Sequence, residues 1–497
     1  MVANHPFGFI EGGILASLLR KLRPDVKIMA NSLLAAFPEA SDLFLLVNPF
    51  GGRAATQQNQ QGLKQAFSHL RQGAPRYFPC GRSRKYRSIA AAVVDPAWNA
   101  NVARLIRLTR ATALPVYFTG TNGPLFHLAG FIHPKLRTAL LPHELLNKQN
   151  RSIEVRVGSV VPPARLAAMD DETAIAYLRR RTYLLQHRRA ARVRIANAVE
   201  VAIIPPVASP FLTAEIAALP GERKLVSISE LDVYYAGAHE IPGVLREIGR
   251  LREITFRAAG EGSGKATDID SFDAHYLQLF IWNREKQEVV GGYRLGEADL
   301  IRSRFGIDGL YTHTLFRYDD RFLDALGPAL EMGRSFVRHD YQKTYAPLLL
   351  LWKGIGAYVA RNPRYAVLFG PVSISNDYQP VSRQLLVSYF DVLDRDSELS
   401  KLVRARNPFR VRQSEVKGHW DLEELSAMIA DIETDHKGVP VLLRQYLKLG
   451  GKLVAFNVDP HFANALDGLI VVDLRRTEVK TVERYLGRQA GGLPRTP

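Results

Sequence analysis

Carboxylate and arginine side chains recur between apolar segments in the second half of the chain. They occur in the order Arg252, Asp270, Asp273, Arg294, Glu331 and Arg334. Segments of β-type composition, such as GGYRL at 291–295, carry or flank these residues. Acids and arginines that alternate with β-type segments at this spacing are typical of a substrate cleft. We therefore predict a site for a charged substrate in this half.

The elements that must position this cleft show strand and helix periodicities. We predict strands at 276–282, 289–295 and 333–337 and helices at 322–331 and 347–361. A charged stretch at 391–412 precedes a last α/β segment at 440–474. We expect that segment to pack on the second domain rather than to fold by itself.

Short apolar runs alternate with helix-like segments over the first 160 residues or so. The runs at 43–47 and 114–118 indicate strands, and 57–70 and 102–110 indicate helices. This alternation predicts an α/β layer with a central sheet. Three prolines at positions 205–210 then interrupt regular structure, which favours a domain boundary nearby.

Length and composition limit the number of domains and the classes of protein that the chain can belong to. The chain has 497 residues, 46% of them hydrophobic, which is enough for roughly two to three domains. Cys80 is the single cysteine, which excludes an internal disulfide and indicates a reducing compartment. The spacing of the histidines suits no metal, and we expect none. No apolar leader or run of about 18 uncharged apolar residues occurs, so we expect a cytoplasmic protein without a membrane span.

The formal net charge is +17, and the arginines are unevenly distributed. Seven fall within 179–194, namely Arg179, Arg180, Arg181, Arg188, Arg189, Arg192 and Arg194. A surface of this sign attracts phosphates, anionic headgroups or acidic proteins. Nucleic acid is disfavoured because no recognition motif accompanies the charge. The cluster also fits a solvated helix face, since acidic residues lie just upstream at 170–172.

The ordered acids and arginines at 252–334 resemble those of the acyl-homoserine-lactone synthases, which belong to the GNAT-like acyltransferases. Further blocks are similar to the ornithine-lipid N-acyltransferases, a family often called hemolysin-like. They are IGRLRE at 248–253, LLWKGIG at 350–356, FGPVSIS at 369–375, FNVDP at 456–460 and LDGL at 466–469. The resemblance covers about residues 228–488.

This resemblance implies transfer of a 3-hydroxy fatty acyl group from acyl carrier protein to the α-amino group of an amino acid, with ornithine favoured. The amine must lose a proton, and the developing oxyanion needs donors in a dry cleft. No cofactor is implied beyond the phosphopantetheine thioester of the donor. The glycine-rich turn of acetyl-CoA-dependent relatives is not evident, which favours the carrier protein over free CoA.

The resemblance also implies roles for individual residues. Glu331 is the catalytic candidate that holds or deprotonates the amine, directly or through water, and Arg334 is the candidate that pairs with the substrate carboxylate. The candidate substrate-binding residues are Arg252, Asp270, Asp273 and Arg294. The two aspartates would bind the ammonium groups of ornithine, and Arg294 would share its carboxylate. The alternative is that these residues form structural ion pairs that orient one another.

The first half resembles the glycerolipid acyltransferases, beginning with NHPFGFIEG at 4–12. In that family a histidine accepts the proton of an acceptor hydroxyl and a carboxylate orients it, roles that here fall to His5 and Glu11. The block FPCGRS at 78–83 resembles the one that binds the substrate phosphate, and its candidate residues are Phe78, Pro79, Gly81 and Arg82. Residues 122–146 look like the version of this domain fused ahead of ornithine-lipid N-acyltransferases.

Three features depart from the glycerolipid pattern. Glu11 lies one residue further from His5 than the aspartate of that family, and Cys80 stands where a glutamate is usual. The histidine is also the fifth residue. We therefore expect it to lie near a frayed end and to be poorly positioned, in a domain that is N-terminally short or degenerate.

We predict an α/β protein with a glycerolipid-acyltransferase-like domain at 1–200, a linker at 201–225 and a GNAT-like mixed-sheet domain at 226–490. The predicted enzyme is a membrane-lipid acyltransferase that N-acylates ornithine or a similar amino acid, and its first domain would add a second chain by O-acylation. Its partners would be acyl carrier protein and the inner face of an anionic membrane, contacted peripherally through 13–23 and 179–194.

Three alternatives stay open at this point. The chain could instead be an acyl-homoserine-lactone-type signal synthase. It could be a glycerophospholipid O-acyltransferase alone. It could also be a non-catalytic adaptor that binds carrier protein or membrane.

Overall fold

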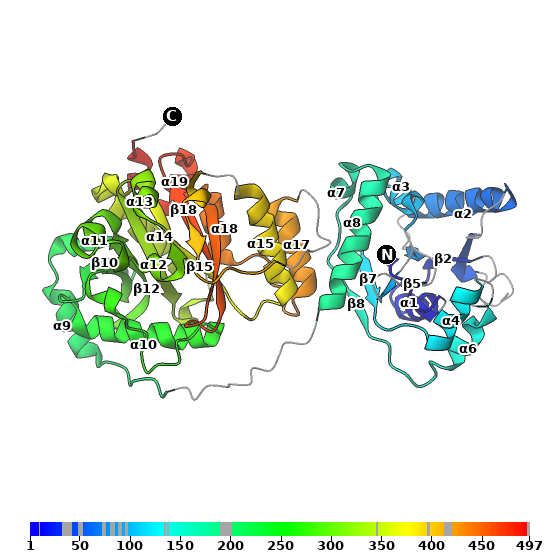
Figure 1. The fold of residues 1–497 in the computed structure, drawn as a ribbon, viewed down its shortest axis with the longest axis horizontal. Coiled ribbons are helices and arrows are strands. Elements are labelled where there is room, and N and C mark those ends of the chain that lie inside the picture. Colours follow the sequence, from blue (N-terminus) through cyan, green and yellow to red (C-terminus); the bar gives the residue numbers. More distant parts are fainter. Residues whose placement is uncertain are drawn as a thin grey trace. The chain divides into compact units, whose positions relative to one another are not determined.

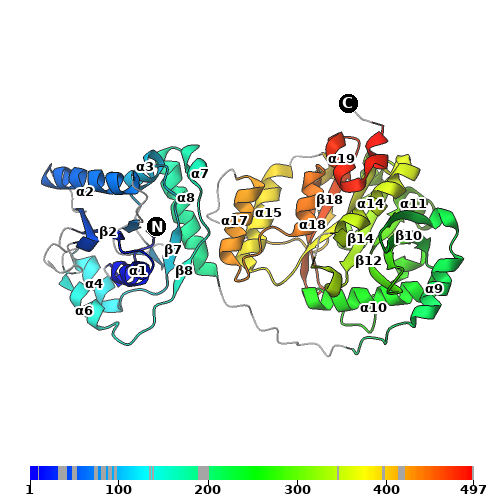
Figure 2. The ribbon, with the colours of Figure 1, turned by 180° about the vertical axis from the view of Figure 1, so that it is seen from behind.

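The computed structural model describes residues 1–8, 10–31, 42–47, 53–71, 76–79, 85–87, 92–94, 98–133, 136, 139–188, 201–343, 346–394, 398–411 and 420–494. The chain divides into two units (Figure 1, Figure 2). Met1–Ala190 and Ser426–Gly438 make up the first unit, and Ala191–Leu425 and Val439–Pro497 make up the second. Each unit has a sheet of its own.

The first unit is built on a six-stranded sheet in the order β3-β2-β4-β1-β7-β8. Its strands are β1 (Val2–Ala3), β2 (Lys27–Asn31), β3 (Phe44–Val47), β4 (Arg76–Pro79), β7 (Pro115–Phe118) and β8 (Val155–Val157). Neighbouring strands are parallel except for β7 and β8. The strands predicted at 43–47 and 114–118 are confirmed as β3 and β7.

Among the described residues, the helices of the first unit include α1 (Ile10–Arg20), α2 (Arg53–Arg71), α3 (Ala100–Leu108), α4 (Pro124–Ile132), α6 (Leu141–Leu146), α7 (Pro163–Ala167), α8 (Asp171–Leu184) and most of α17 (Leu422–Ile432). The helices predicted at 57–70 and 102–110 correspond to α2 and α3. Polar side chains begin two of them: Asn99 accepts from the backbone of Asn101, and Asp170 accepts from that of Thr173. Apolar residues of α3 and α8 share one buried cluster.

The strand that precedes His5 lies in the middle of this sheet. β1 pairs with β4 on one side and with β7 on the other, so that Val2 lies opposite both Phe78 and Pro115. Val2 and Ala3 are fully buried. The expectation that His5 lies at a frayed end is therefore wrong, because two neighbouring strands hold the residues just before it.

One arginine of the 179–194 cluster is buried in the first unit. Arg181 follows Tyr177 by one turn on the inner face of α8, and its Nε donates to Asp431 Oδ2 at 2.7 Å. Arg188 donates to the backbone oxygens of Asp431 and Val157. For these two arginines both predicted readings, a solvated face and an anion-binding surface, are wrong, because they bind protein groups. Arg189, Arg192 and Arg194 lie outside the described residues.

The second unit is built on an eight-stranded sheet in the order β17-β18-β15-β14-β12-β11-β10-β9. Its strands are β9 (Lys224–Ile228), β10 (Leu231–Gly237), β11 (Leu277–Asn283), β12 (Glu288–Glu297), β14 (Ala329–Val337), β15 (Val367–Ile374), β17 (Lys452–Asp459) and β18 (Ala465–Asp473). Only β14 and β15 form a parallel pair among these described strands. The strands predicted at 276–282 and 289–295 are confirmed, and the last segment joins this sheet as expected.

The helix predicted at 322–331 is wrong in its second half. Helix α13 (Asp320–Leu326) ends at Gly327, which has a φ of +67°, and Pro328 follows. A glycine with positive φ ends a helix readily, and proline lacks the N–H that would continue it. The chain then enters β14 at Ala329, which places Glu331 on a strand rather than on a helix.

Helices cover both faces of the second sheet (Figure 1). Helix α14 (Ala346–Arg361) packs on one face, where a Cβ at Gly354 would lie only 2.6 Å from Val233. Helix α10 (Pro242–Ala259) packs on the other through Ile248, which shares a buried cluster with Phe280. The helix predicted at 347–361 is thus confirmed as α14.

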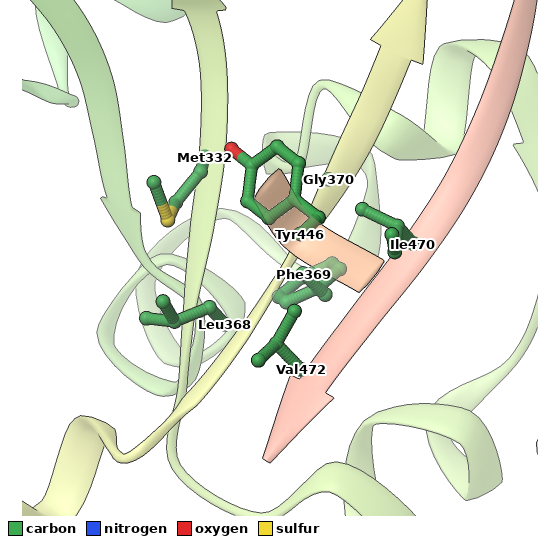
Figure 3. Close-up of a pocket in the computed structure, with 7 residues that line it drawn as sticks. All are labelled: Met332, Leu368, Phe369, Gly370, Tyr446, Ile470 and Val472. Atoms are coloured by element: carbon green, nitrogen blue, oxygen red, sulfur yellow. The ribbon is translucent and has the colours of Figure 1, made fainter. Parts of the chain in front are cut away.

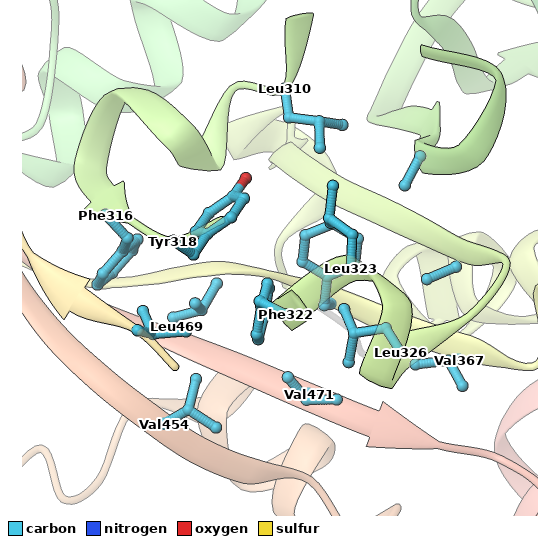
Figure 4. Close-up of a cluster of buried hydrophobic side chains, with 14 of the residues drawn as sticks. Leu310, Phe316, Tyr318, Phe322, Leu323, Leu326, Val367, Val454, Leu469 and Val471 are labelled. Carbon is cyan, nitrogen blue, oxygen red and sulfur yellow. The ribbon is translucent and has the colours of Figure 1, made fainter. Parts of the chain in front are cut away.

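Shorter helices complete the second unit. They include α9 (Ser209–Ala218), α11 (Ala298–Phe305), α12 (Thr312–Leu315), α15 (Pro380–Asp394), α18 (Val441–Lys448) and α19 (Val479–Leu486). Figure 4 shows Phe322, Leu323 and Leu326 of α13 in one cluster with Leu469 and Val471 of β18. Among the described residues, every helix is too short or too polar to cross a lipid bilayer.

Candidate active site

Strands β14 and β15 run side by side for three residues and then part. Residues 329–331 pair with 367–369, and beyond them β14 follows β12 while β15 follows β18. A cavity of about 70 Å³ lies in this fork. Its polar wall residues include Tyr311, Arg334, Ser335, Ser373, Asp459 and Asp467. We call it the fork cavity.

An apolar pocket adjoins the fork cavity through Met332 and Tyr446, which line both. Figure 3 shows Tyr446 with its hydroxyl on the side of Met332 and its ring near Phe369 of β15. The side chains around this pocket leave no room for a water molecule. Gly370 is required here, because a Cβ at that position would lie 2.0 Å from the backbone oxygen of Met332.

A β-bulge places Arg334 at the fork cavity. Gly333 lies opposite Arg294 and Phe336 lies opposite Gly292, so β14 has one more residue than β12 between these pairs. The extra residue of a bulge is left unpaired and bends the strand. Arg334 has a φ of +50°, which is uncommon for a residue with a Cβ and often marks a functional position.

The charged residues predicted for this half form one buried network. Arg252 Nη1 lies 2.9 Å from Asp273 Oδ1. Arg294 Nη1 lies 2.6 Å from Asp270 Oδ1 and 3.4 Å from Asp273 Oδ1. Arg334 Nη2 lies 3.3 Å from Asp270 Oδ2. The structure thus brings together five residues that are widely separated in the sequence.

This network balances its own charges. Burial alone would raise the pKa of Asp273, but the charges of Arg252 and Arg294 outweigh it and hold that pKa well below its usual range. Asp270 and Asp273 also cap the short turn between them. Within the described residues, the wall of the fork cavity includes neither aspartate and neither of these two arginines. The four predicted substrate-binding residues contact one another in this structure.

Arg334 joins the network to the fork cavity. Its Nε lies 3.1 Å from Asp268 Oδ2, and its Nη1 donates to the hydroxyl of Tyr311 at 3.1 Å. The guanidinium also lies 4.8 Å from the ring of Tyr311 and 5.1 Å from that of Phe462, distances at which a cation is attracted to an aromatic face. These contacts hold a cationic side chain rigidly in the cavity wall.

Glu331 lies on β14 at the vertex of the fork and is 2% exposed. Its carboxylate accepts a hydrogen bond from the hydroxyl of Tyr276 and another from the backbone N of Thr312 at 2.6 Å. The Tyr276 hydroxyl accepts in turn from the backbone N of Tyr311 at 2.9 Å. Burial raises the pKa of Glu331. A direct contact between Glu331 and a substrate would require one of these two bonds to open.

Two cavity carboxylates were not among the predicted site residues. Asp459 and Asp467 lie in the blocks FNVDP and LDGL, which carried the family resemblance without a role. The sequence signal for Asp467 is its place in a mostly apolar segment at 465–473. Eight of the nine residues of this strand, β18, are buried, and Asp467 is one of them. An acidic side chain is almost never buried without a partner, so its position in this strand marks a special site.

In the first unit, the structure brings His5 and Glu11 together. Nδ1 of His5 lies 3.4 Å from Oε2 of Glu11. Glu11 is fully buried in the first turn of α1, where its other oxygen accepts from the backbone N of Phe7 at 2.6 Å and of Gly8 at 3.3 Å. A carboxylate on one ring nitrogen is the arrangement that fixes an imidazole tautomer.

Two buried asparagines hold the loop that follows β1. Asn4 Nδ2 donates to the backbone oxygen of Phe118 at 2.9 Å, and Asn4 Oδ1 accepts from the backbone N of Phe118 at 2.7 Å. Asn122 Nδ2 donates to the backbone oxygen of Phe7 at 3.0 Å. These bonds fix the backbone on both sides of His5.

The predicted phosphate-binding block is described only in part. Phe78 and Pro79 lie on β4, directly opposite the two residues of β1 that precede the His5 loop. Gly81 and Arg82, together with Cys80, lie outside the described residues.

Known proteins match both halves of the chain. Residues 1–191 match the family model described as Acyltransferase, and residues 251–352 match the one described as Acetyltransferase (GNAT) domain. A glycine N(alpha)-acyltransferase of Bacteroides thetaiotaomicron is 34% identical over 271 residues, which are 52% of this chain and 75% of that protein. An L-ornithine N(alpha)-acyltransferase of Agrobacterium fabrum is 24% identical over 246 residues, which are 48% of this chain and 78% of that protein.

Among solved structures, a CoA-dependent acyl-homoserine lactone synthase is 14% identical, with a TM-score of 0.27, over 52% of this chain and 88% of that one. A score this low does not establish a shared fold. The family models and the relatives define an acyltransferase with an acyltransferase domain followed by a GNAT domain that holds the large mixed sheet. The chain belongs to the acyltransferase family of the glycine N(alpha)-acyltransferase described above.

Proposed function

We propose that the second unit transfers a fatty acyl group from a thioester donor to the α-amino group of an amino acid. The fork cavity carries this proposal, because the cationic Arg334 and two buried carboxylates face one space there. Groups of both signs around one cavity match the zwitterion of an amino acid. The relatives named for glycine and L-ornithine support the same class of acceptor.

In this proposal, the bulge on β14 and the hydroxyl of Tyr311 supply the hydrogen-bond donors for the developing oxyanion. The extra residue of a bulge keeps its backbone N–H out of the ladder. The backbone N–H at Arg334 can therefore donate a hydrogen bond to the thioester oxygen. Burial raises the pKa of Tyr311 to about 12, which keeps its hydroxyl protonated near neutral pH. Because that oxygen accepts from Arg334, its own proton can point to a carbonyl oxygen in the cavity. The Arg334 guanidinium pairs with the carboxylate of the amino acid.

Glu331 acts as a positioning residue in this scheme. It holds Tyr276 and the backbone of Thr312, and through them the turn that presents Tyr311 to the cavity. The family resemblance implied that Glu331 contacts the amine. In this scheme other groups contact the amine instead. The network of Arg252, Asp273 and Arg294 fixes the neighbouring strands and the orientation of Asp270, which in turn contacts Arg334.

For the donor we propose a 3-hydroxyacyl group on acyl carrier protein, and for the acceptor ornithine or a similar amino acid. The net charge of +17 favours an acidic protein partner. We further propose that the enzyme works peripherally at the inner, cytoplasmic face of an anionic membrane. Leu18 and Leu22 support this, since they are 48% and 80% exposed beside Arg20 and Lys21 in the predicted contact segment.

A purified enzyme assay tests the reaction. The chain is incubated with 3-hydroxyacyl carrier protein and either ornithine or glycine, and the products are identified by mass spectrometry. We expect an N-acyl amino acid with free thiol released in equal amount. Thioester hydrolysis without amide formation for either amine would contradict the proposal. Formation of an acyl-homoserine lactone from S-adenosylmethionine in the same assay would support the signal-synthase alternative instead.

We propose O-acyl transfer as the function of the first unit, on the glycerolipid-acyltransferase pattern. The contact between His5 and the fully buried Glu11 is the observation that favours it. His5 would take the proton of the 3-hydroxyl of the N-acylated product while Glu11 orients the ring. Conversion of purified mono-acyl product to a diacyl lipid by the wild-type chain, and not by His5→Ala, is the expected result. Equal conversion by both would remove His5 from the reaction.

A further inference from the structure

Asp459 and Asp467 stand apart from the charge network of the second unit. Asp467 lies on β18 opposite Ser373 of β15, and Asp459 is the last residue of β17. Each is 5% exposed, and both line the fork cavity. The two strands therefore deliver two carboxylates to the wall of the cavity that Arg334 also lines.

Within the described part of the chain, neither carboxylate has an ion pair of its own. Among the described residues, no hydrogen bond or ion pair reaches the side chain of Asp467. The side chain of Asp459 accepts a bond from the backbone N of His461 at 2.9 Å. Arg334 is close enough to lower the pKa of Asp467, but its guanidinium already pairs with Asp268 and Asp270.

Negative charge is therefore in excess around the cavity. Burial raises the pKa of Asp467 well above its usual range, the charges of Asp459 and Glu261 act in the same direction, and Arg334 opposes them. Glu261, which follows α10, is buried and accepts from the hydroxyl of Ser373 at 2.8 Å. Like charges in a buried space destabilise the ionised state unless a cation joins them. A proton on Asp467 or a positively charged guest offsets this charge, so the cavity suits a group that brings both a positive charge and a proton to give up.

We propose that Asp459 and Asp467 bind the ammonium group of the acceptor amino acid and that Asp467 takes its proton. This inference rests on the proposed N-acylation. A primary ammonium has three donors, which suit two carboxylates. One water needs about 10–15 Å³, so a cavity of about 70 Å³ has room for several, and the amine of an amino acid fits such a space.

The step balances without a further reactant. The ammonium gives one proton to Asp467 and becomes a neutral amine. Its nitrogen bonds to the thioester carbonyl carbon, and the carbon–sulfur bond then breaks. A second proton leaves the nitrogen as the amide forms and ends on the departing thiol. Glu331 is not needed for this transfer, since both of its oxygens already accept from protein groups.

The test compares Asp467→Asn and Asp459→Asn with Asp473→Asn. Asp473 is a matched control because it ends the same strand, pairs with Arg475 and lies outside the cavity wall. With ornithine or glycine, whichever the wild type accepts, we expect kcat/KM for the amine to fall at least a hundredfold in Asp467→Asn and at least tenfold in Asp459→Asn. The control stays within threefold of wild type. The dissociation constant for acyl carrier protein is unchanged in all three.

A pH profile separates a chemical role from a structural one. If Asp467 takes the proton, Asp467→Asn regains activity between pH 7 and 9.5, where more amine is already neutral, and its melting temperature equals or exceeds that of wild type. Wild-type kcat/KM in Asp467→Asn overturns the inference, as does a loss that persists at pH 9.5 together with a lower melting temperature. If the wild type itself forms no amide, the proposed function fails before this question arises.

Discussion

The carboxylate of Glu331 accepts a hydrogen bond from the hydroxyl of Tyr276 in the interior of the second unit. The same carboxylate accepts from the backbone of Thr312, and the Tyr276 hydroxyl accepts from the backbone of Tyr311. One acid thus fixes two consecutive residues of the turn that enters the cavity wall. Glu331 therefore holds the turn of the site in place, so its replacement should change both the stability of the fold and the rate of the reaction.

Replacement of Glu331 should therefore change both properties. In Glu331→Ala, Tyr276 and the backbone of Thr312 lose their acceptor, which costs about 1–3 kcal/mol for each buried group left unsatisfied. We expect a lower melting temperature for the second unit and at least a tenfold lower kcat. Tyr276→Phe should lower kcat by less, because the Thr312 bond remains. A loss of activity in Glu331→Gln with unchanged melting temperature would point instead to Glu331 as the base, and thermal scans with steady-state kinetics distinguish the two.

Arg334 should not tolerate lysine. Its guanidinium contacts Asp268, Asp270 and Tyr311 at once, and an ammonium group cannot reach three such partners from one position. We expect Arg334→Lys to lower kcat/KM for the amino acid more than a hundredfold although the charge is kept. Arg338 directly follows β14 and lies outside the cavity wall, so Arg338→Lys serves as the control and should stay near wild type. Comparable kinetics for both variants would remove Arg334 from substrate binding.

Substitutions in the His5 pair should separate the two reactions. His5→Ala should abolish diacyl product and leave N-acylation unchanged, since His5 belongs to the first unit and N-acylation is assigned to the second. Glu11→Gln keeps an oxygen for the backbone N of Phe7 but not the charge that stabilises an imidazolium, so we expect roughly a 10- to 100-fold loss of O-acylation. Mass spectrometry of the mono- to diacyl ratio measures both effects. A drop in N-acylation in either variant would mean that the first unit influences the second reaction.

The rate with acyl carrier protein should depend on salt. The chain has a net charge of +17, and the attraction between it and an acidic partner weakens as the screening length falls from about 14 Å to 6 Å between roughly 50 and 300 mM salt. We expect kcat/KM for the carrier-bound donor to fall over this range. An uncharged acyl-pantetheine thioester is the matched donor and should show no such trend. A salt-independent rate with both donors would assign the basic surface to another partner, most simply the membrane.

Acid stability should report the Asp273 network. Because the folded-state pKa of Asp273 lies below the unfolded one, its ion pairs contribute stability fully above about pH 4, and that contribution is lost as pH falls through the folded pKa. Asp273→Asn leaves Arg252 and Arg294 short of a buried partner, which costs about 3–5 kcal/mol at neutral pH. We expect the difference in melting temperature between wild type and Asp273→Asn to be constant from pH 5 to 7 and to shrink below pH 4. Asp319→Asn, where the pKa of the aspartate is also lowered by Arg321 but solvent screens the ion pair, should show the same pattern with a much smaller amplitude.

Local sequence patterns predicted the strands and helices better than they predicted the contacts of the side chains. The apolar segments at 276–282 and 289–295 predicted β11 and β12 because a short run rich in aromatic and branched residues favours a strand by itself. The helix expected to run through 331 stops at Gly327, although Gly327 and Pro328 are themselves a local stop signal that outweighs the apolar spacing. The frayed end expected at His5 was wrong for another reason. Pairing with β4 and β7, which lie far along the chain, cannot be read from residues 1–5.

The sequence by itself determined the class of chemistry, because several of its blocks, such as those at 369–375 and 466–469, resemble those of known acyltransferases in the same order. It did not determine which of them face a substrate. Arg252, Asp270, Asp273 and Arg294 share one network because α10, β12 and the short turn before β11 meet in space, and their charges are thereby neutralised by one another. Asp459 and Asp467 face the fork cavity because β18 pairs with β15, whose sequence lies about a hundred residues away. Burial and charge balance depend on such distant pairings, so only the tertiary structure decided which carboxylates remain for a ligand.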